Sequence, residues 1–358
     1  MGIESLARPD IVAMTPYSSA RKEAPGVGIL LNANEAPWPL IEEPGCLNRY
    51  PDPQPAQLLS RLARLYALPE DRVLVTRGSD EGIDLLTRVF CRAGQDAILQ
   101  CPPNFGMYQI AARTQGAQII SVNRDPQKDF ELDQQAVVQS LRDNPQIKLI
   151  FLTSPNNPTG DVIDPRFLER LLQETRNQTI VVLDEDYAEF SDQASAVNLI
   201  NENAQLVVLR TLSKAWASAG LRCGVVLAQP EVIDLLRRVI APYPLPSPVV
   251  ELALRMLEPG VLEKQQALLE RLRFNKQYLL DALRKLSFIR KIIPGQANFV
   301  LIKVDHADEV LTYCARHGVI LRGFPSDPMM AGYIRISIGS NDDLAALIKL
   351  LEEWENPK

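Results

Sequence analysis

Histidine and cysteine are scarce in this sequence, with two and five residues respectively among 358. The cysteines are scattered and lack CxxC spacing, so we expect no disulfide framework and no bound metal. No uninterrupted apolar segment approaches the roughly 20 residues that span a bilayer, and the opening MGIESLARPD has no basic region before an apolar one. These absences predict a cytoplasmic protein with reduced core cysteines and no membrane partner.

A strong charge of either sign is also missing. The 38 Lys and Arg residues face 44 Asp and Glu residues, which gives a formal net charge of −6. We therefore expect no general attraction to nucleic acid, although a local basic pocket is compatible with this balance. The 46% hydrophobic share is that of a globular protein, and the length predicts two domains or one large domain with an appendage.

Short apolar runs alternate with helical patterns through the first two thirds of the chain. The runs are RVLVT (72–76), AILQC (97–101), AQIISV (117–122), KLIFL (148–152), TIVVLD (179–184), QLVVLR (205–210) and GVVLA (224–228). Their near-continuous apolar character predicts strands covered on both faces, and segments such as 80–94 and 165–178 between them are typical of helices. This alternation predicts an α/β fold with a mostly parallel, seven-stranded sheet flanked by helices.

The pattern changes after about residue 230. The proline-rich stretch 241–248 interrupts a helical pattern, and a long amphipathic segment follows at 259–287. ANFVLIKV (297–304), GVILRG (318–323) and YIRISIG (333–339) are strand candidates interleaved with helices, which indicates a smaller α+β domain. We predict an N-terminal arm with part of the small domain at 1–45, a large domain at 46–255 and a small C-terminal domain at 256–358.

Polar residues follow three of the predicted strands, where ligands gather in an open α/β sheet. SPNNPTG (154–160) places the amide of Asn157 after one strand, and DEDYAEF (184–190) places Asp184 and Tyr187 after the next. Taken alone, the first segment fits a turn whose Asn side chains bond their own backbone, and Asp184 fits a helix cap. The functional alternative is an amide and a phenol that donate hydrogen bonds beside a buried acid, which faces a cationic ring nitrogen.

The third segment, RTLSKAWASAGLRCG (210–224), places Lys214 among small and hydroxylated residues. Lysine forms imines with aldehydes when its amine is desolvated, and Arg222 offers a phosphate-binding fork. A solvated loop lysine is the plain alternative. Upstream, Gly78, Ser79 and Asp80 resemble a helix start whose free N–H groups could seat a phosphate, or an ordinary helix cap. The conjunction of a lysine, an acid, donors and a phosphate seat favours an aldehyde cofactor with a pyridine ring.

These segments resemble the fold-type I pyridoxal-phosphate-dependent aminotransferases, and the chain is similar to their histidinol-phosphate aminotransferase family over nearly its full length. The motifs that carry the resemblance are LNANE (31–35), NRYPDPQ (48–54), RGSDEGI (77–83), CPPNFGMY (101–108), SPNNPTG, DEDY (184–187), TLSKAWASAGLRCG, APYPLP (241–246) and YIRISIG. The resemblance implies pyridoxal 5′-phosphate as the cofactor. It also implies that Lys214 holds this cofactor covalently and carries protons, while Asp184 pairs with the ring nitrogen.

Further roles follow from the resemblance. Asn157 and Tyr187 would donate to the ring oxygen, and Phe105 would stack on the ring where the family usually has tyrosine; a core aromatic is the equal alternative for Phe105. The phosphate would be held by backbone groups at Ser79 and Asp80, the hydroxyls of Thr211 and Ser213, and the guanidinium of Arg222. Tyr50 would reach the cofactor phosphate of a neighbouring subunit, which implies a homodimer with shared active sites. Asn104 and Asp186 depart from the usual Thr and Ala, and Asp186 adds a charge near the cofactor acid.

Arg335 alternates with apolar neighbours in YIRISIG, so it should project from one face of a strand. The resemblance places Arg335 and Arg322 in the substrate site, where they would bind anionic groups of the substrates, with Tyr17 as a further lining residue. It implies amino transfer from L-histidinol phosphate to 2-oxoglutarate, which gives imidazole acetol phosphate and L-glutamate in histidine biosynthesis. The alternatives are an aromatic amino acid aminotransferase, a phosphothreonine decarboxylase, and a non-catalytic binding or regulatory protein that retains the fold.

Overall fold

A seven-stranded sheet forms the larger part of the protein in a computed structural model that describes residues 2–17, 29, 31–41 and 47–355. Its strands are β1 (Val73–Thr76), β2 (Ala97–Gln100), β3 (Gln118–Ser121), β4 (Ile147–Thr153), β5 (Ile180–Asp184), β6 (Leu206–Thr211) and β7 (Gly224–Leu227). The order is β1-β7-β6-β5-β4-β2-β3, and β7 lies antiparallel between β1 and β6 while the other pairs are parallel. The predicted mostly parallel seven-stranded sheet is confirmed.

Helices cover both faces of this sheet, which explains the near-continuous apolar runs. Val181 and Leu183 of β5 pack into the core that includes α3 (Ala56–Leu65), α6 (Gln134–Asp143), α7 (Pro165–Glu174) and α9 (Ser247–Met256). Val182, between them, faces the opposite core with α4 (Ser79–Phe90), α5 (Met107–Gln115) and α8 (Pro230–Val239). Two short helical turns that the sequence did not predict, η1 (Ile3–Leu6) and α1 (Pro9–Val12), join this second core.

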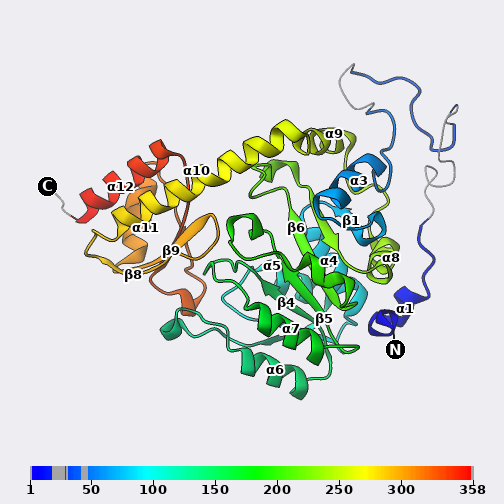
Figure 1. The fold of residues 1–358 in the computed structure, drawn as a ribbon, viewed down its shortest axis with the longest axis horizontal. Helices are drawn as coiled ribbons and strands as arrows, with labels where there is room; N and C mark the ends of the chain where they lie inside the picture. Colours follow the sequence, from blue (N-terminus) through cyan, green and yellow to red (C-terminus); the bar gives the residue numbers. More distant parts are fainter. Residues whose placement is uncertain (1, 18–28, 30, 42–46, 356–358) are drawn as a thin grey trace.

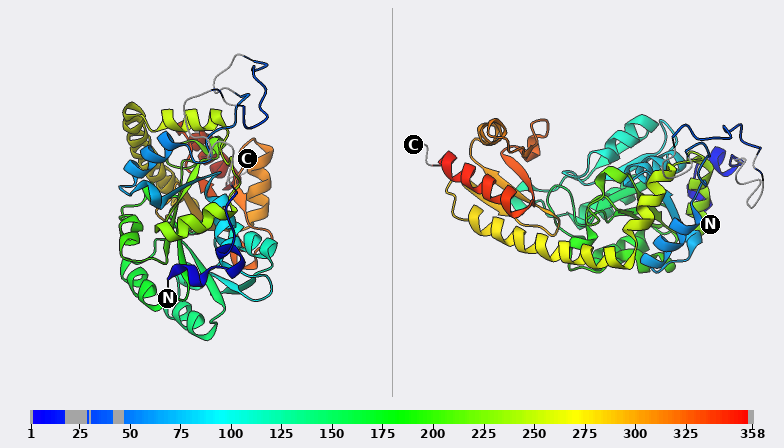
Figure 2. Two further views of the ribbon diagram at one scale, coloured as in Figure 1. Left: turned by 90° about the vertical axis from the view of Figure 1, so that its right-hand side faces the viewer. Right: turned by 90° about the horizontal axis from the view of Figure 1, so that it is seen from above.

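A second, four-stranded sheet lies toward the C-terminus in the order β10-β11-β9-β8, with all pairs antiparallel. Its strands are β8 (Ile289–Ile293), β9 (Phe299–Val304), β10 (Arg322–Gly323) and β11 (Tyr333–Ser337), and it packs with α10 (Pro259–Leu283), α11 (Ala307–Arg316) and α12 (Asn341–Glu355). The long helix α10 runs from the large sheet to the small one, and the two termini lie at opposite ends of the molecule (Figures 1 and 2).

Some element boundaries differ from the sequence predictions. The long helix ends at Leu283 rather than 287, because the chain turns there and Leu286 packs into the C-terminal core. The run 318–323 is paired only at Arg322–Gly323, and Ile320 is exposed. The edge strand β8 was missed. The remaining 3-10 turns are η2 (Glu70–Arg72), η3 (Pro126–Lys128), η4 (Ala188–Phe190), η5 (Ala196–Asn201), η6 (Ala219–Leu221) and η7 (Pro328–Met330).

Two further observations concern expectations from composition. Within the described ranges, no helix combines the length and apolar character needed to cross a membrane. Cys91, Cys101, Cys223 and Cys314 are buried free thiols, and Cys46 lies outside the described residues. The division of the chain at residues 45 and 255 stays a prediction.

Candidate active site

The ends of β4, β5 and β6 bring three polar segments to one edge of the large sheet. Thr153, Asp184 and Thr211 are the last residues of these strands, and the chain continues from them into 154–160, 185–190 and 212–222. Because the three strands are parallel, their carboxyl ends meet at the same edge. The structure therefore groups the segments that carry Asn157, Tyr187 and Lys214, as expected for an open α/β sheet.

Asp184 is a buried carboxyl group held by two donors. Its Oδ2 accepts from the Tyr108 hydroxyl at 2.7 Å, and its Oδ1 accepts from the backbone N–H of Asp186 at 3.1 Å. Burial raises the pKa of Asp184 to about 6, against the lowering effect of these two hydrogen bonds. A cation placed against this carboxyl group would hold it ionised.

Lys214 lies in the loop after β6, over the aromatic face of Tyr187. Its Nζ is 5.5 Å from the centre of the Tyr187 ring, and the Lys214 charge also acts on both Asp184 and Asp186. Tyr187 is buried, with its ring edge-on to Phe299 at 5.4 Å, and burial raises the pKa of its phenol. A neutral phenol is a hydrogen-bond donor, so an amine, a donor and a buried acid share one site.

The start of α4 lies beside the loop that follows Lys214. The helix begins at Ser79 after Gly78, whose φ is 78°. Arg222 donates to the Ser213 hydroxyl at 3.3 Å and to Asp80 Oδ2 at 3.2 Å, and the Thr211 hydroxyl donates to Ser213 Oγ at 2.9 Å. The N-terminus of α4, the hydroxyl groups of Thr211 and Ser213 and the Arg222 guanidinium therefore lie close together. These groups are typical ligands of a phosphate, and we call this place the phosphate seat.

Two glycines permit the close approach of these segments. A Cβ at Gly224 would lie 2.6 Å from the carbonyl carbon of Gly78 and 2.8 Å from the backbone nitrogen of Ser79. A Cβ at Gly78 would lie 2.6 Å from Arg222 Nη2. The first turn of α4 can therefore meet β7 and Arg222 only where side chains are absent.

Asn157 and Arg335 meet across the two sheets. Arg335 Nη1 donates to Asn157 Oδ1, and the Arg335 guanidinium lies 5.2 Å from the centre of the Phe299 ring. Arg335 Nε is buried and has no hydrogen-bond partner among the described residues. Arg322 is the cross-strand neighbour of Arg335 but is exposed, with its guanidinium 6.0 Å from the centre of the Phe324 ring. This pair of cations can bind an anion at the junction of the sheets.

The other three aromatic candidates lie in different settings. Phe105 is half-buried and packs edge-on against Tyr108, with the ring centres 5.9 Å apart. Tyr50 is exposed on one side and stacks on Tyr243 at 4.5 Å. Tyr17 is 70% exposed, and in the described part of the chain no hydrogen bond or ring contact joins it to the site. Phe105 therefore packs against the Asp184 donor, whereas Tyr17 is not brought into the group.

Tyr108 also belongs to this group of side chains, although it was not predicted from the sequence. Its fully buried hydroxyl lies 2.7 Å from Thr153 Oγ1 as well as 2.7 Å from Asp184, and its ring stacks on Phe151. A tyrosine within a helical pattern is indistinguishable from a core aromatic in sequence. The only signal was its place at the end of the CPPNFGMY motif.

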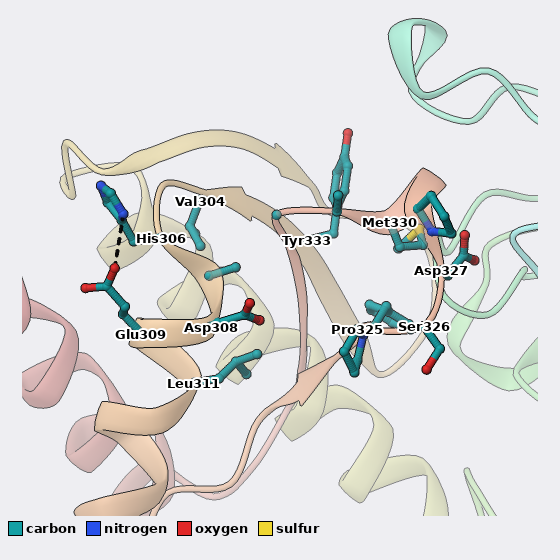
Figure 3. A pocket seen from close by; sticks show the side chains of 15 residues that line it. Val304, His306, Asp308, Glu309, Leu311, Pro325, Ser326, Asp327, Met330 and Tyr333 are labelled. Atoms are coloured by element: carbon teal, nitrogen blue, oxygen red, sulfur yellow. Dashed lines mark ion pairs between the residues drawn. The ribbon is translucent and has the colours of Figure 1, made fainter.

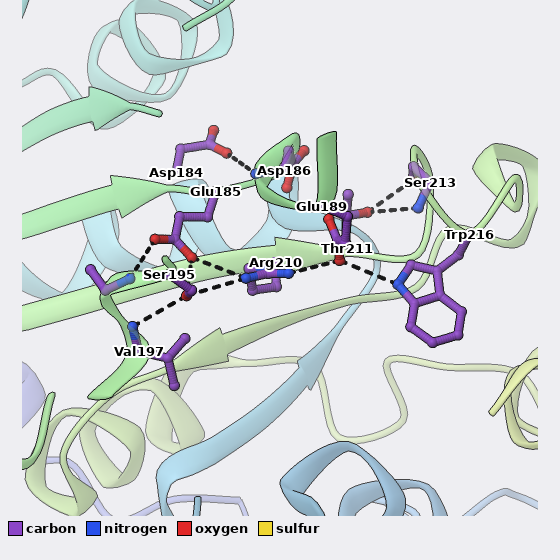
Figure 4. A network of polar contacts seen from close by, with 11 residues as sticks. Asp184, Glu185, Asp186, Glu189, Ser195, Val197, Arg210, Thr211, Ser213 and Trp216 are labelled. Atoms are coloured by element: carbon purple, nitrogen blue, oxygen red, sulfur yellow. Dashed lines mark hydrogen bonds and ion pairs between the residues drawn. The ribbon is translucent and has the colours of Figure 1, made fainter. Parts of the chain in front are cut away.

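An ion-pair network also escaped the sequence analysis (Figure 4). Arg210 of β6 is buried and pairs with Glu185 at 3.0 Å and with Glu189 at 2.7 Å. Trp216, two residues beyond Lys214, donates from Nε1 to Glu189 at 3.4 Å. The network thus ties the segment after Asp184 to the loop that carries Lys214. Loss of one partner in such a buried pair typically costs about 3–5 kcal/mol.

A separate cavity of about 480 Å³ lies in the C-terminal part (Figure 3). It is lined by residues between Val304 and Tyr333, including Asp308, Glu309 and Asp327. None of the candidate residues above lines it. Within the described ranges, no group of three or more His, Cys, Asp or Glu side chains is arranged to hold a metal ion.

Comparisons with known proteins show which family the chain belongs to. Residues 22–351 match the family described as aminotransferase class I and II. The histidinol-phosphate aminotransferase of Aeromonas hydrophila subsp. hydrophila is 42% identical over 363 residues, which cover 100% of this chain and 99% of that protein. The solved structure of histidinol-phosphate aminotransferase from Sinorhizobium meliloti in complex with pyridoxal-5′-phosphate has a TM-score of 0.78 at 19% identity, covering 87% of this chain and 84% of that one. L-threonine-O-3-phosphate decarboxylase from Porphyromonas gingivalis has a TM-score of 0.71 at 22% identity, covering 86% and 91% of the two chains.

Proposed function

The chain belongs to the class I and II aminotransferase family, and on that premise we propose that it transfers the amino group of L-histidinol phosphate to 2-oxoglutarate. The products are imidazole acetol phosphate and L-glutamate, and the reaction is a step of histidine biosynthesis. The observation that carries the proposal is the grouping of Lys214, the buried Asp184 and the phosphate seat at α4, in a chain 42% identical to a histidinol-phosphate aminotransferase.

The described residues fit pyridoxal 5′-phosphate as the cofactor. The Asp184 carboxyl group is buried and forms no ion pair with the residues that the structure describes, and a protonated ring nitrogen would supply a cation. Gly78 and Gly224 let Arg222 and β7 approach the first turn of α4 closely, so the Arg222 guanidinium would stand beside a phosphate bound there. When bound, this cofactor supplies an aldehyde that combines with amino groups and a ring that withdraws electrons from the substrate.

Each residue near the reacting atoms has a separate task. Lys214 Nζ would hold the cofactor between turnovers and, once the amino group of the substrate has displaced it, would take the proton that leaves the substrate α carbon. Asp184 keeps the ring nitrogen protonated, and Tyr108 holds the Asp184 carboxyl group in place. Tyr187 and Asn157 donate to the ring oxygen; because Asn157 Oδ1 is engaged by Arg335, its Nδ2 is left to donate.

Substrate recognition falls to the two arginines at the junction of the sheets. Arg335 and Arg322 bind the phosphate of histidinol phosphate in one half reaction and a carboxylate of glutamate in the other. The buried Arg335 Nε, which has no partner in the described part of the chain, supports a ligand at this point. Tyr17 stays a candidate for lining the pocket, and Phe105 for stacking on the cofactor ring.

A substrate panel tests the choice of donor. The purified protein should transfer the amino group of histidinol phosphate to 2-oxoglutarate with a higher kcat/KM than that of phenylalanine or tyrosine. Preference for an aromatic amino acid would reject the proposed donor, and release of carbon dioxide from phosphothreonine would favour a decarboxylase. A protein whose cofactor absorbance does not respond to any amino donor would be a binding protein that has only retained the fold.

We also propose a homodimer in the cytoplasm. Large apolar side chains are exposed along the N-terminal segment, namely Ile29, Leu31, Trp38, Leu40, Ile41 and Leu47. Such a concentration is typical of an interaction surface, and a second copy of the chain would cover it. Tyr50, at the end of this segment, would then reach the phosphate of the partner's cofactor. The four buried free cysteines fit a reducing compartment.

A further inference from the structure

Asp186 places a second carboxyl group between the Asp184 carboxyl and the start of α4. Its backbone N–H donates to Asp184 Oδ1 at 3.1 Å, and its Oδ2 lies 2.8 Å from the Ser79 hydroxyl oxygen. The other oxygen, Oδ1, is buried without a hydrogen-bond partner in the part of the chain that the structure describes. The Asp186 carboxyl group therefore contacts the first residue of α4, in the proposed phosphate seat.

The hydrogen bond between Asp186 and Ser79 has two forms that differ in one proton. Ser79 Oγ carries a single hydrogen. If Asp186 is ionised, this hydrogen must point to Asp186, and only lone pairs of Ser79 remain to face a phosphate. If Asp186 is protonated, its Oδ2–H can donate to Ser79 Oγ, and the Ser79 hydrogen is free to donate to a phosphate oxygen.

The surroundings of Asp186 favour the protonated form. The titratable groups that act on Asp186, or on which it acts, are Asp184, Asp80, Lys214, Tyr66, Tyr108 and Tyr187. Burial, followed by the negative charge of Asp184, raises the pKa of Asp186 well above its ordinary value, while Ser79 and Lys214 act in the opposite direction. Two adjacent buried carboxyl groups rarely ionise together.

We propose that Asp186 is a positioning residue that couples phosphate binding to one proton, because the neutral carboxyl group turns the Ser79 hydroxyl toward the cofactor phosphate. The inference rests on the proposed cofactor site. It predicts that binding of a phosphate-bearing cofactor weakens as pH rises through the range in which Asp186 of the free protein loses its proton. Each pH unit beyond that point should then weaken binding by up to about tenfold.

The test uses cofactor-free protein and pyridoxamine 5′-phosphate, which binds without forming a bond to Lys214. Its Kd is measured by calorimetry from pH 6 to pH 10 for the unaltered protein and for Asp186→Asn, whose amide donates to Ser79 at every pH. The titration of the probe's own phosphate affects both proteins equally. The Kd of the unaltered protein divided by the Kd of Asp186→Asn therefore isolates the effect of Asp186. This ratio should rise with pH, and it should stay constant when pyridoxamine without phosphate is the probe.

Two further variants separate the Ser79 contact from simple charge repulsion. Asp80→Asn removes one negative charge near the seat but leaves the contact between Asp186 and Ser79 in place. The pH dependence should persist in this variant and begin at lower pH, because the charge of Asp80 raises the pKa of Asp186. In Ser79→Ala, the effect of Asp186→Asn should become independent of pH; a dependence that persists there would mean repulsion alone and would overturn the proposal.

If the ratio of the two Kd values does not change with pH in proteins that retain Ser79, infrared spectroscopy decides between the remaining explanations. A protonated carboxyl band that is present throughout and lost in Asp186→Asn supports a proton retained over the whole range. Its absence overturns the proposal. If no protein binds pyridoxamine 5′-phosphate at any pH, the cofactor site itself is wrong, which is a distinct failure.

Discussion

At the scale of single residues, burial of Asp184, the proposed partner of the cofactor ring nitrogen, lowers the stability of the folded protein. The pKa of Asp184 rises from 3.8 to about 6 through burial, so the folded protein binds more protons than the unfolded chain between these values. Stability without cofactor therefore falls as pH rises through this window and stays low above it. The cost at neutral pH is about 3 kcal/mol.

We expect Asp184→Asn to stabilise the cofactor-free protein while it weakens catalysis. The amide oxygen can accept from the Asp186 N–H, and the amide nitrogen can donate to Tyr108, whose hydroxyl then turns to Thr153. Urea unfolding should show a gain of up to about 3 kcal/mol at pH 8 and little gain at pH 4. An equal gain at both pH values would contradict the ionisation argument.

Arg335 provides a second prediction at this scale. Arg335→Lys keeps the charge but loses the planar fork, so kcat/KM should fall on the order of 10–100-fold for both histidinol phosphate and glutamate. Arg290→Lys is the matched control, because Arg290 lies on the same sheet, where it pairs with Asp305 and donates to the Ser287 carbonyl oxygen on the surface. Unchanged kinetics for both substrates in Arg335→Lys would remove this residue from the pocket.

At the scale of elements, the seat at α4 depends on how closely β7 approaches the helix. Gly224→Ala would bring a Cβ to 2.8 Å from the Ser79 nitrogen and push the first turn of α4 away. We expect affinity for pyridoxal phosphate to fall on the order of tenfold or more, as measured by equilibrium titration. Gly220→Ala, in the turn η6 that precedes β7, would place its Cβ with no described atom outside its own turn within 4 Å and should bind normally. Equal affinity of the two variants would show that the approach is unimportant.

The strands of the large sheet could be predicted from sequence because two covered faces require continuous apolar runs, as in 179–184. The edge strand β8 could not, because Arg290 and Lys291 interrupt its apolar pattern directly after a helix. Strand ends also located Lys214, Asp184 and Asn157. Tyr108 and Arg210 were not predicted because their contacts at the site join residues distant in sequence, and each alone resembles an ordinary core or strand residue.

At the scale of the whole molecule, the exposed apolar N-terminal segment should be covered in a dimer. Leu40→Glu introduces a charge into this surface, so sedimentation equilibrium should show a shift toward monomer, with lower activity at low protein concentration. Phe274→Glu, at another exposed apolar position that lies on α10, should leave the dimer intact. A monomeric unaltered protein with full activity would refute the shared active site.

The central claim is that Lys214 forms the covalent link to pyridoxal 5′-phosphate beside Asp184. Borohydride reduction of the cofactor-loaded protein, followed by proteolysis and mass spectrometry, tests it directly. The account predicts that the peptide containing Lys214 carries the added cofactor mass, and that Lys214→Ala carries none while it remains folded. A reduced cofactor found on another lysine, or on no lysine at all, would contradict the account.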